Sequence, residues 1–242
     1  MPALITLSHG SRHTRAEPTV RRLTEAAGRE LAVPAFSAHL DFTTPTLPEA
    51  AQGLVREGVT EAVVVPLLFT RAFHAKNDVP AVFREAVAAS GMRLHLATGL
   101  GTGPDVAAVL SQRVRADAPP GSHLVLYSVG SSDLAANQDV HDLAQAVGQR
   151  TGRTIEVVPA TGGAGRGGAG LIESTLHHRA LHVLPLFVAD GLLLDKITTR
   201  LDRISEATGT RITASRPLGT DLAGVVAQRY HEECQALNLL NA

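Results

Sequence analysis

Short apolar runs alternate with amphipathic stretches along the whole chain, and this alternation is the feature that most limits its fold. The apolar runs have the length of strands, and the stretches between them carry apolar residues at helical spacing. We predict strands over residues 3–8, 36–40, 62–68, 93–97, 123–128, 154–158, 181–186 and 211–215. We predict helices over residues 17–31, 48–57, 79–90, 105–116, 137–151, 168–178, 190–207 and 221–237. Strands that alternate with helices of this length predict parallel sheets joined by right-handed crossovers.

The sequence of the second half of the chain is similar to that of the first at several short segments, in the same order. Residues 126–131 (Leu-Tyr-Ser-Val-Gly-Ser) align with residues 6–11 (Thr-Leu-Ser-His-Gly-Ser), and a later Leu-Gly-Thr at 218–220 aligns with the same tripeptide at 100–102. The Gly-Ser and Leu-Gly-Thr matches lie outside the predicted strands, so the shared composition of buried strands does not explain them. We therefore predict an internal duplication.

A breaker cluster, Ala-Pro-Pro-Gly at residues 118–121, separates the two copies and is typical of a linker. A chain of 242 residues is long enough for two domains of about 120 residues each. We expect an α/β protein with two similar lobes, each a mostly parallel sheet flanked by helices, and a cleft between them. The expected domain boundaries are residues 1–118 and 122–242.

The composition excludes several classes of function. The net charge is −1 and aromatic residues make up 3% of the chain, without tryptophan, which argues against general binding to nucleic acid or to an anionic membrane. Cys234 is the one cysteine, so an internal disulfide and an all-cysteine cluster are excluded. There is no apolar run of about 20 residues and no charged leader before the first strand. We therefore expect a cytoplasmic protein without membrane contact.

Two histidines stand directly after predicted buried strands or shortly beyond them. His9 follows the first strand, and His74 follows the third. Because the carboxyl ends of parallel strands meet at one edge of a sheet, both imidazoles can converge on one metal ion or substrate. Val129 replaces His9 in the second copy, and Leu192 or Leu193 falls opposite His74, so the first copy is expected to be the catalytic lobe. The nine other histidines are expected to be surface residues or hydrogen-bonded core residues.

These segments resemble a known family. A strand ending in Ser-His-Gly-Ser-Arg (8–12), then Pro-Leu-Leu-Phe (66–69) running to His74 with Asp-Val-Pro at 78–80, is similar to the class II tetrapyrrole chelatases, the sirohydrochlorin cobalto- or ferrochelatases in their two-lobed form. The resemblance implies that His9 and His74 bind the metal and act on the macrocycle. A third family position, usually glutamate, falls on Asp41, so the resemblance implies this residue as a third metal ligand with a side chain shorter by about one methylene group.

The chemistry of metal insertion agrees with these residue types. Insertion requires the loss of two pyrrole protons and of water from the ion, and a neutral imidazole can accept a proton or bind a metal near pH 7. Two histidines and a carboxylate suit Fe²⁺ or Co²⁺ with open coordination positions. No phosphate-binding Gly-x-x-x-x-Gly-Lys motif is present, so ATP is not implied. We expect sirohydrochlorin and a divalent metal, with Fe²⁺ favoured, as substrates, no further cofactor, and a monomer.

Sirohydrochlorin carries eight carboxylates, and a nearly neutral protein must bind them through local donors. A glycine-rich stretch at 162–168 contains Arg166 and reads either as a flexible loop or as a lid that meets carboxylates. Asp78 is expected to cap the helix at 79–90. The predicted substrate-binding residues are Ser8, Gly10, Ser11, Arg12, Arg71, Lys76 and Arg166.

Three other functions remain open from the sequence. A cobaltochelatase of corrinoid synthesis would use the same residues. A two-lobed protein that binds a metal or anion without catalysis would have the same fold. A phosphohydrolase with a nucleophilic histidine is the third, although its arginine precedes the His-Gly pair, whereas Arg12 follows it here.

Overall fold

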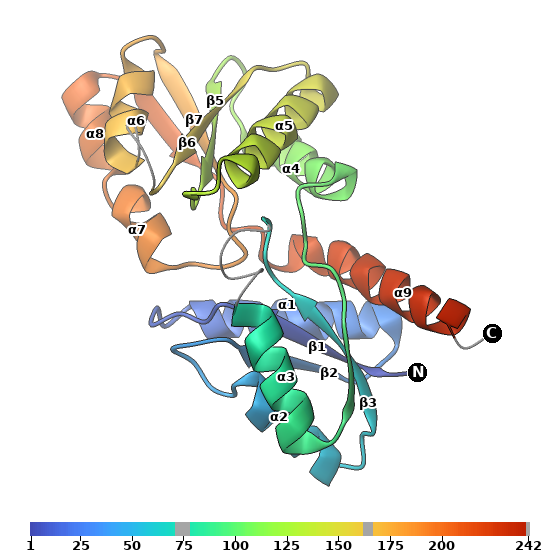
Figure 1. Ribbon diagram of the computed structural model, residues 1–242. Coiled ribbons are helices and arrows are strands. Elements are labelled where there is room, and N and C mark those ends of the chain that lie inside the picture. Colours follow the sequence, from blue (N-terminus) through green and yellow to red (C-terminus); the bar gives the residue numbers. More distant parts are fainter. Residues whose placement is uncertain (71–77, 162–166, 241–242) are drawn as a thin grey trace. The chain divides into compact units, whose positions relative to one another are not determined.

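A computed structural model describes residues 1–70, 78–161 and 167–240 of the chain. The chain forms two compact units: unit 1 comprises Met1–Gly101 and Gly219–Ala242, and unit 2 comprises Thr102–Leu218. Each unit contains a four-stranded parallel sheet flanked by helices (Figure 1). The predicted α/β class and the parallel sheets are confirmed.

The sheet of unit 1 has the strand order β2-β1-β3-β4. Its strands are β1 (Ala3–Ser8), β2 (Ala35–His39), β3 (Glu61–Pro66) and β4 (Arg93–Leu96). Its helices are α1 (Ala16–Leu31), α2 (Leu47–Arg56), α3 (Val79–Ser90), the 3-10 helix η2 (Gly219–Leu222) and α9 (Ala223–Leu240). Ile5 and Leu7 pack with α2 and α3, whereas the hydroxyl of Thr6 lies 2.5 Å from that of Thr24 on α1. Strand β1 is therefore covered on both faces and completely buried.

The sheet of unit 2 has the equivalent order β6-β5-β7-β8. Its strands are β5 (His123–Ser128), β6 (Ile155–Pro159), β7 (Ala180–Pro185) and β8 (Arg211–Ala214). Its helices are α4 (Pro104–Asp117), α5 (Leu134–Thr151), α6 (Gly167–Thr175), α7 (Leu192–Thr198) and α8 (Leu201–Thr208). Val125 and Tyr127 of β5 pack with α6, α7 and α8, and Figure 1 shows α4 and α5 on the other face of this sheet.

The strand order creates the same switch point in both sheets. β1 pairs with β2 on one side and with β3 on the other, so the direction of the chain across the sheet reverses between β1 and β3. Ligands of open parallel sheets bind beyond the carboxyl ends of the strands at such a point. In unit 1 this point lies next to Ser8 and His9, and in unit 2 the reversal lies between β5 and β7.

The compact units have other bounds than the predicted lobes, 1–118 and 122–242. Helix α4 packs on α5, and α9 packs on α1 and β3, so the last helix of each half belongs to the unit built by the other half. The hydroxyl of Tyr230 on α9 donates to the carbonyl of Pro2 at 2.6 Å, which fixes this helix in unit 1. The breaker cluster at 118–121 joins α4 to β5 within unit 2, so a Pro-Gly break does not mark the boundary.

The single helix predicted over 190–207 is two helices, α7 and α8. The hydroxyls of Thr198 and Thr199 donate to the carbonyls of Leu194 and Asp195, at 3.2 and 2.6 Å. Such back-bonding slightly destabilises a helix and often bends it, and the two threonines stand where the helix is interrupted. In the part of the chain that the structure describes, no helix is long and apolar enough to span a membrane.

Candidate functional site

The turn after β1, residues 8–13, presents His9 at the carboxyl edge of the sheet; we call it the first turn. The N–H groups of Leu40 and Asp41 donate to the carbonyls of Ser8 and His9, at 2.9 and 3.0 Å. The pairing of β1 with β2 therefore continues beyond the strands. His9 itself is half-buried, and Asp41 is exposed.

The backbone of Asp41 approaches residue 10 so closely that this residue must be glycine. Its φ is +86°, and a Cβ on it would lie 1.7 Å from the carbonyl oxygen of Asp41. A side chain at this position meets both backbone strain and a clash with backbone. The turn thus brings the backbones of His9 and Asp41 together in a way that only glycine allows.

The segment after β2 closes the other side of the first turn. The hydroxyl of Thr43 accepts the N–H of Ser11 at 3.1 Å and donates to its carbonyl at 3.0 Å. The Phe42 ring meets the His9 ring edge to face, with 5.9 Å between centroids, and the Arg12 guanidinium lies 4.9 Å from the centroid of the same ring. Phe42 therefore supports both His9 and Arg12 from one exposed position.

Helix α2 begins directly after this segment, and its start is encoded locally. The Thr46 hydroxyl accepts the N–H of Glu49, and the Glu49 carboxylate accepts the N–H of Thr46, which forms a capping box. The Thr-Leu-Pro-Glu sequence thus limits the segment that carries Asp41 to a few residues between β2 and α2.

His39 is a further residue of this site and is not among the residues predicted from the sequence. It is the last residue of β2, it is 1% exposed, and its Nδ1 lies 2.7 Å from the hydroxyl of Ser8. Burial lowers the pKa of His39, and the Glu17 carboxylate opposes this shift in part. One signal in the sequence was its place at a strand end two residues before Asp41.

The structure brings together six of the predicted site residues: Ser8, His9, Gly10, Ser11, Arg12 and Asp41. The N–H groups of Gly10 and Ser11 donate to Ser8 and Thr43, so two of the predicted neutral donors hold the turn itself. Arg12 is exposed and points over Phe42. The predicted residues that lie outside the described ranges are Arg71, His74, Lys76 and Arg166.

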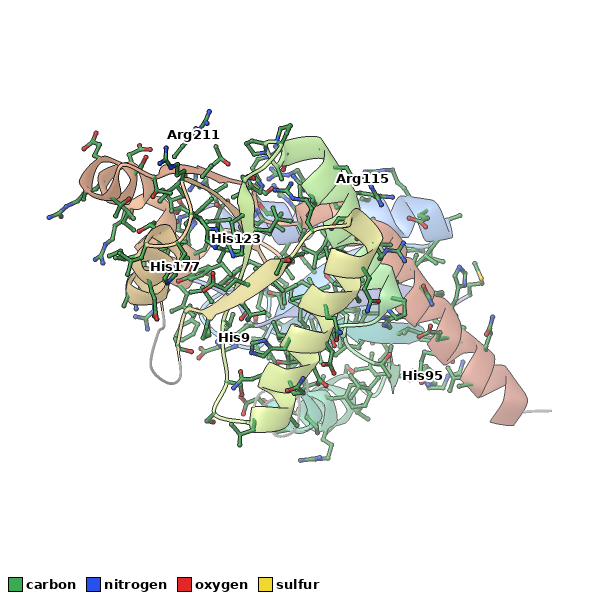
Figure 2. The ribbon with its side chains drawn as sticks, turned by 90° about the horizontal axis from the view of Figure 1, so that it is seen from above. His9, His95, Arg115, His123, His177 and Arg211 are labelled. Carbon is green, nitrogen blue, oxygen red and sulfur yellow. The ribbon has the colours of Figure 1, made fainter. Side chains whose placement is uncertain are left out.

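Among the described titratable groups of unit 1, His95 lies outside this cluster. His95 on β4 is level with Leu4 in the sheet register and bonds Glu61, and Figure 2 shows it well apart from His9. Within residues 1–70, 78–161 and 167–240, no three His, Cys, Asp or Glu side chains are gathered as a metal site. The described residues thus supply part of the predicted ligand set. Asp78 stands at the N-cap of α3, but its side chain makes no capping hydrogen bond, so the predicted cap is wrong.

Unit 1 also has a cavity of about 620 Å³ at the carboxyl ends of β3 and β4. No residue of the first turn is among its described lining residues. Its lining is mostly apolar, with the buried Arg229 and the exposed Glu232 as charged groups. The described lining residues are Pro66, Leu68, Phe69, Thr70, Val79, Leu96, Ala97, Thr98, Gly99, Gly101, Arg229 and Glu232.

The turn after β5, residues 128–133, repeats the backbone of the first turn; we call it the second turn. The N–H groups of Ala160 and Thr161 donate to the carbonyls of Ser128 and Val129, at 2.7 and 3.0 Å. Gly130 has a φ of +80°, and a Cβ on it would lie 2.2 Å from the Thr161 carbonyl oxygen. The second turn has the same geometry without an imidazole or a carboxylate at the corresponding positions.

The fold and this site define a class: a duplicated parallel α/β protein with a histidine at the switch point of one copy. The CbiX family model matches the chain twice, over residues 3–117 and 123–233. The chain therefore belongs to the CbiX family, and the two matches confirm the predicted duplication.

Individual relatives agree with this assignment. The sirohydrochlorin ferrochelatase of Priestia megaterium is 25% identical over 213 residues, which cover 85% of this chain and 80% of that protein. The sirohydrochlorin cobaltochelatase of Sulfurisphaera tokodaii is 35% identical over 75 residues, which cover 31% of this chain and 60% of that protein. The structure of SirB from Bacillus subtilis with Fe³⁺ superposes with a TM-score of 0.80 at 20% identity and covers 98% of both chains, so the two share a fold.

Proposed function

We propose that this protein inserts a divalent metal ion into sirohydrochlorin, a lyase reaction that makes a metallated tetrapyrrole. The observation that carries the proposal is the first turn, in which two backbone hydrogen bonds hold His9 beside Asp41 in a copy of the CbiX fold. The relative that matches both halves of the chain is named as a sirohydrochlorin ferrochelatase, which supports this substrate class.

In the proposed mechanism the metal is a substrate that His9, His74 and Asp41 hold before insertion. Imidazole nitrogen and carboxylate oxygen suit Fe²⁺ and Co²⁺, and the negative carboxylate offsets part of the charge of the ion. Insertion releases two protons from the pyrrole N–H groups, and an imidazole nitrogen that has passed the metal to the macrocycle is then free to accept one of them. His9 and His74 therefore act first as ligands and then as acceptors of one proton each.

The carboxylates of the macrocycle need cationic partners near the metal. Arg12 is exposed beside His9 and is free of ion pairs to carboxylates among the described residues, so we assign it to a substrate carboxylate. Arg71, Lys76 and Arg166 are further candidates for this role. We also propose that the second half binds and orients the macrocycle without touching the metal, since orientation alone can lower a barrier by several kcal/mol.

The metal that we favour is Fe²⁺, because the relative that covers 85% of the chain is named as a ferrochelatase, whereas the named cobaltochelatase matches 31% of it. The test is anaerobic turnover of sirohydrochlorin with Fe²⁺ and with Co²⁺ at equal free concentrations, followed by absorption spectroscopy. Insertion of either metal above the uncatalysed rate supports a chelatase, and a higher kcat/KM with Fe²⁺ supports the iron assignment. Absence of insertion with both metals contradicts the proposal, and tight metal binding without insertion would instead indicate a binding protein.

A further inference from the structure

A buried histidine lies at the base of the first turn. His39 Nδ1 is 2.7 Å from the hydroxyl oxygen of Ser8, and the same oxygen accepts the N–H of Gly10 at 3.2 Å. Because that oxygen already accepts the Gly10 N–H, its own hydrogen can be donated to Nδ1 of His39. Ser8 and Gly10 precede and follow His9 in the sequence. These hydrogen bonds therefore connect His39 to the residues on both sides of the candidate ligand.

His39 is also linked to the second candidate ligand of the first turn. It stands two residues before Asp41, whose N–H donates to the carbonyl of His9 at 3.0 Å. Ser8 and His39 are register partners at the ends of β1 and β2. The hydrogen bond between their side chains therefore ties together the two strand ends from which His9 and Asp41 emerge.

The second turn shows that the backbone does not need this histidine. There the register partner of Ser128 is Pro159, whose ring offers no hydrogen-bonding group. The second turn nevertheless makes the two equivalent backbone hydrogen bonds, from Ala160 and Thr161. His39 is thus absent from the copy in which Val129 and Thr161 replace His9 and Asp41.

A buried histidine at position 39 is unfavourable for the stability of the fold. Burial of a polar ring costs free energy when its groups lack partners. Nε2 of His39 is buried and has no hydrogen-bond partner among the residues that the structure describes. The fold of the turn does not need the residue, and the burial of Nε2 disfavours it, so a functional role accounts for it better than a structural one.

We infer that His39 is a positioning residue for metal insertion: its hydrogen bond to Ser8 restrains the ends of β1 and β2 more tightly than the backbone hydrogen bonds alone, so that His9 and Asp41 meet the same metal ion. The inference rests on the proposed function and adds a residue that does not touch the metal. Groups that orient metal ligands through hydrogen bonds contribute about 10–100-fold to metal affinity or activity. Removal of the His39–Ser8 hydrogen bond should therefore weaken metal binding without removing a ligand.

The test compares His39→Ala, Ser8→Ala and His39→Asn in the full chain. Co²⁺ affinity is measured by anaerobic titration of its visible absorption bands without tetrapyrrole, and insertion is measured as kcat and KM. We expect His39→Ala and Ser8→Ala each to weaken Co²⁺ binding about 10–100-fold and to lower kcat with little change in the KM for sirohydrochlorin. His39→Asn should recover most of the affinity, because the asparagine amide can replace Nδ1 as the partner of Ser8.

His182 supplies the matched control. It is a buried histidine of unit 2 that bonds the hydroxyls of Thr213 at 2.7 Å and Ser215 at 3.0 Å. His182→Ala should lower the melting temperature and leave Co²⁺ affinity unchanged, which separates loss of a buried histidine from loss of positioning.

The outcomes distinguish this inference from the proposed function. A wild-type protein that neither binds Co²⁺ nor inserts a metal contradicts the proposed function, and the inference falls with it. If the wild type is active, wild-type Co²⁺ affinity in folded His39→Ala or in Ser8→Ala overturns the inference. An equal loss of Co²⁺ affinity in His182→Ala overturns it as well. If His39→Ala does not fold, Ser8→Ala and His39→Asn decide the result.

Discussion

The first and second turns share a backbone and differ in chemistry. In the first turn, the hydroxyl of Ser11 accepts the backbone N–H of His13 at 3.1 Å. In the second turn, the hydroxyl of Ser131 accepts the backbone N–H of Asp133 at 3.0 Å. The residue before each serine, Gly10 or Gly130, is a glycine with positive φ. A few residues are thus enough to build the turn, and the residues present in the first turn alone are the candidates for chemistry.

Replacement of the histidine should have the largest effect. His9→Ala is expected to lower metal insertion by about 10²–10⁴-fold, the range that a positioned acid–base group supplies. The free energy of unfolding should change by no more than about 1 kcal/mol, because His9 is not a packed core residue. Insertion assays and urea unfolding measure the two quantities.

The control for this change is Val129→Ala at the same position of the second turn. Val129 is 46% exposed, so its truncation should change stability little and leave Co²⁺ affinity as in the wild type. Full insertion activity in His9→Ala would mean that the difference between the two turns has no catalytic meaning.

Substitution of Gly10 and Gly130 tests the backbone conformation that the two turns share. Gly10→Ala and Gly130→Ala should each destabilise the protein by about 2 kcal/mol or more, because alanine is strained at these φ values and meets backbone oxygen. Gly10→Ala should also weaken Co²⁺ binding, whereas Gly130→Ala should not. Urea unfolding and Co²⁺ titration check both, and an equal loss of Co²⁺ affinity in the two variants would show that both turns bind the metal.

The carboxylate should contribute less than the histidine. Asp41→Ala is expected to weaken Co²⁺ binding about tenfold, since the ion loses one oxygen ligand and a compensating charge. Thr161→Ala is the matched change; it removes the hydroxyl that donates to the Val129 carbonyl at 2.8 Å and should leave Co²⁺ affinity unchanged. Isothermal titration with Co²⁺ measures both, and unchanged affinity in Asp41→Ala would remove Asp41 from the ligand set.

The smallest effect concerns the pH dependence of stability in unit 2. Burial lowers the pKa of His182, the Asp117 carboxylate opposes the shift, and Arg153 adds to it. Between the lowered folded value and the unfolded value of about 6.5, the unfolded chain binds more protons, so the free energy of unfolding falls as the pH drops below about 6.5.

His182→Asn should flatten this dependence and leave Co²⁺ affinity unchanged, in contrast to substitutions at His39. Urea unfolding at a series of pH values from 7.5 to 5.0 measures the slope. A slope equal to that of the wild type would mean that His182 is not a source of the pH dependence.

The structure brings predicted site residues together where the signal in the sequence was local. Ser8 to Arg12 lie where the end of an apolar run predicted a strand end, and Asp41 lies beside His9 because β1 and β2 are neighbours in a parallel sheet. The role of His39 was not predictable in this way. A histidine at the end of a strand can face solvent or core, and the pairing of His39 with Ser8, 31 residues away, decides which.

The sequence by itself determined the parallel α/β class, the duplication and the placement of His9 at a strand end. These features follow from periodicity and from matches between nearby residues, which each segment carries without reference to the rest of the chain. The tertiary structure decided which unit receives each terminal helix. Helices α4 and α9 follow equivalent Leu-Gly-Thr segments, and packing on α5 in one case and on α1 in the other assigns them. That assignment depends on surfaces built by residues far apart in sequence, and no local pattern encodes it.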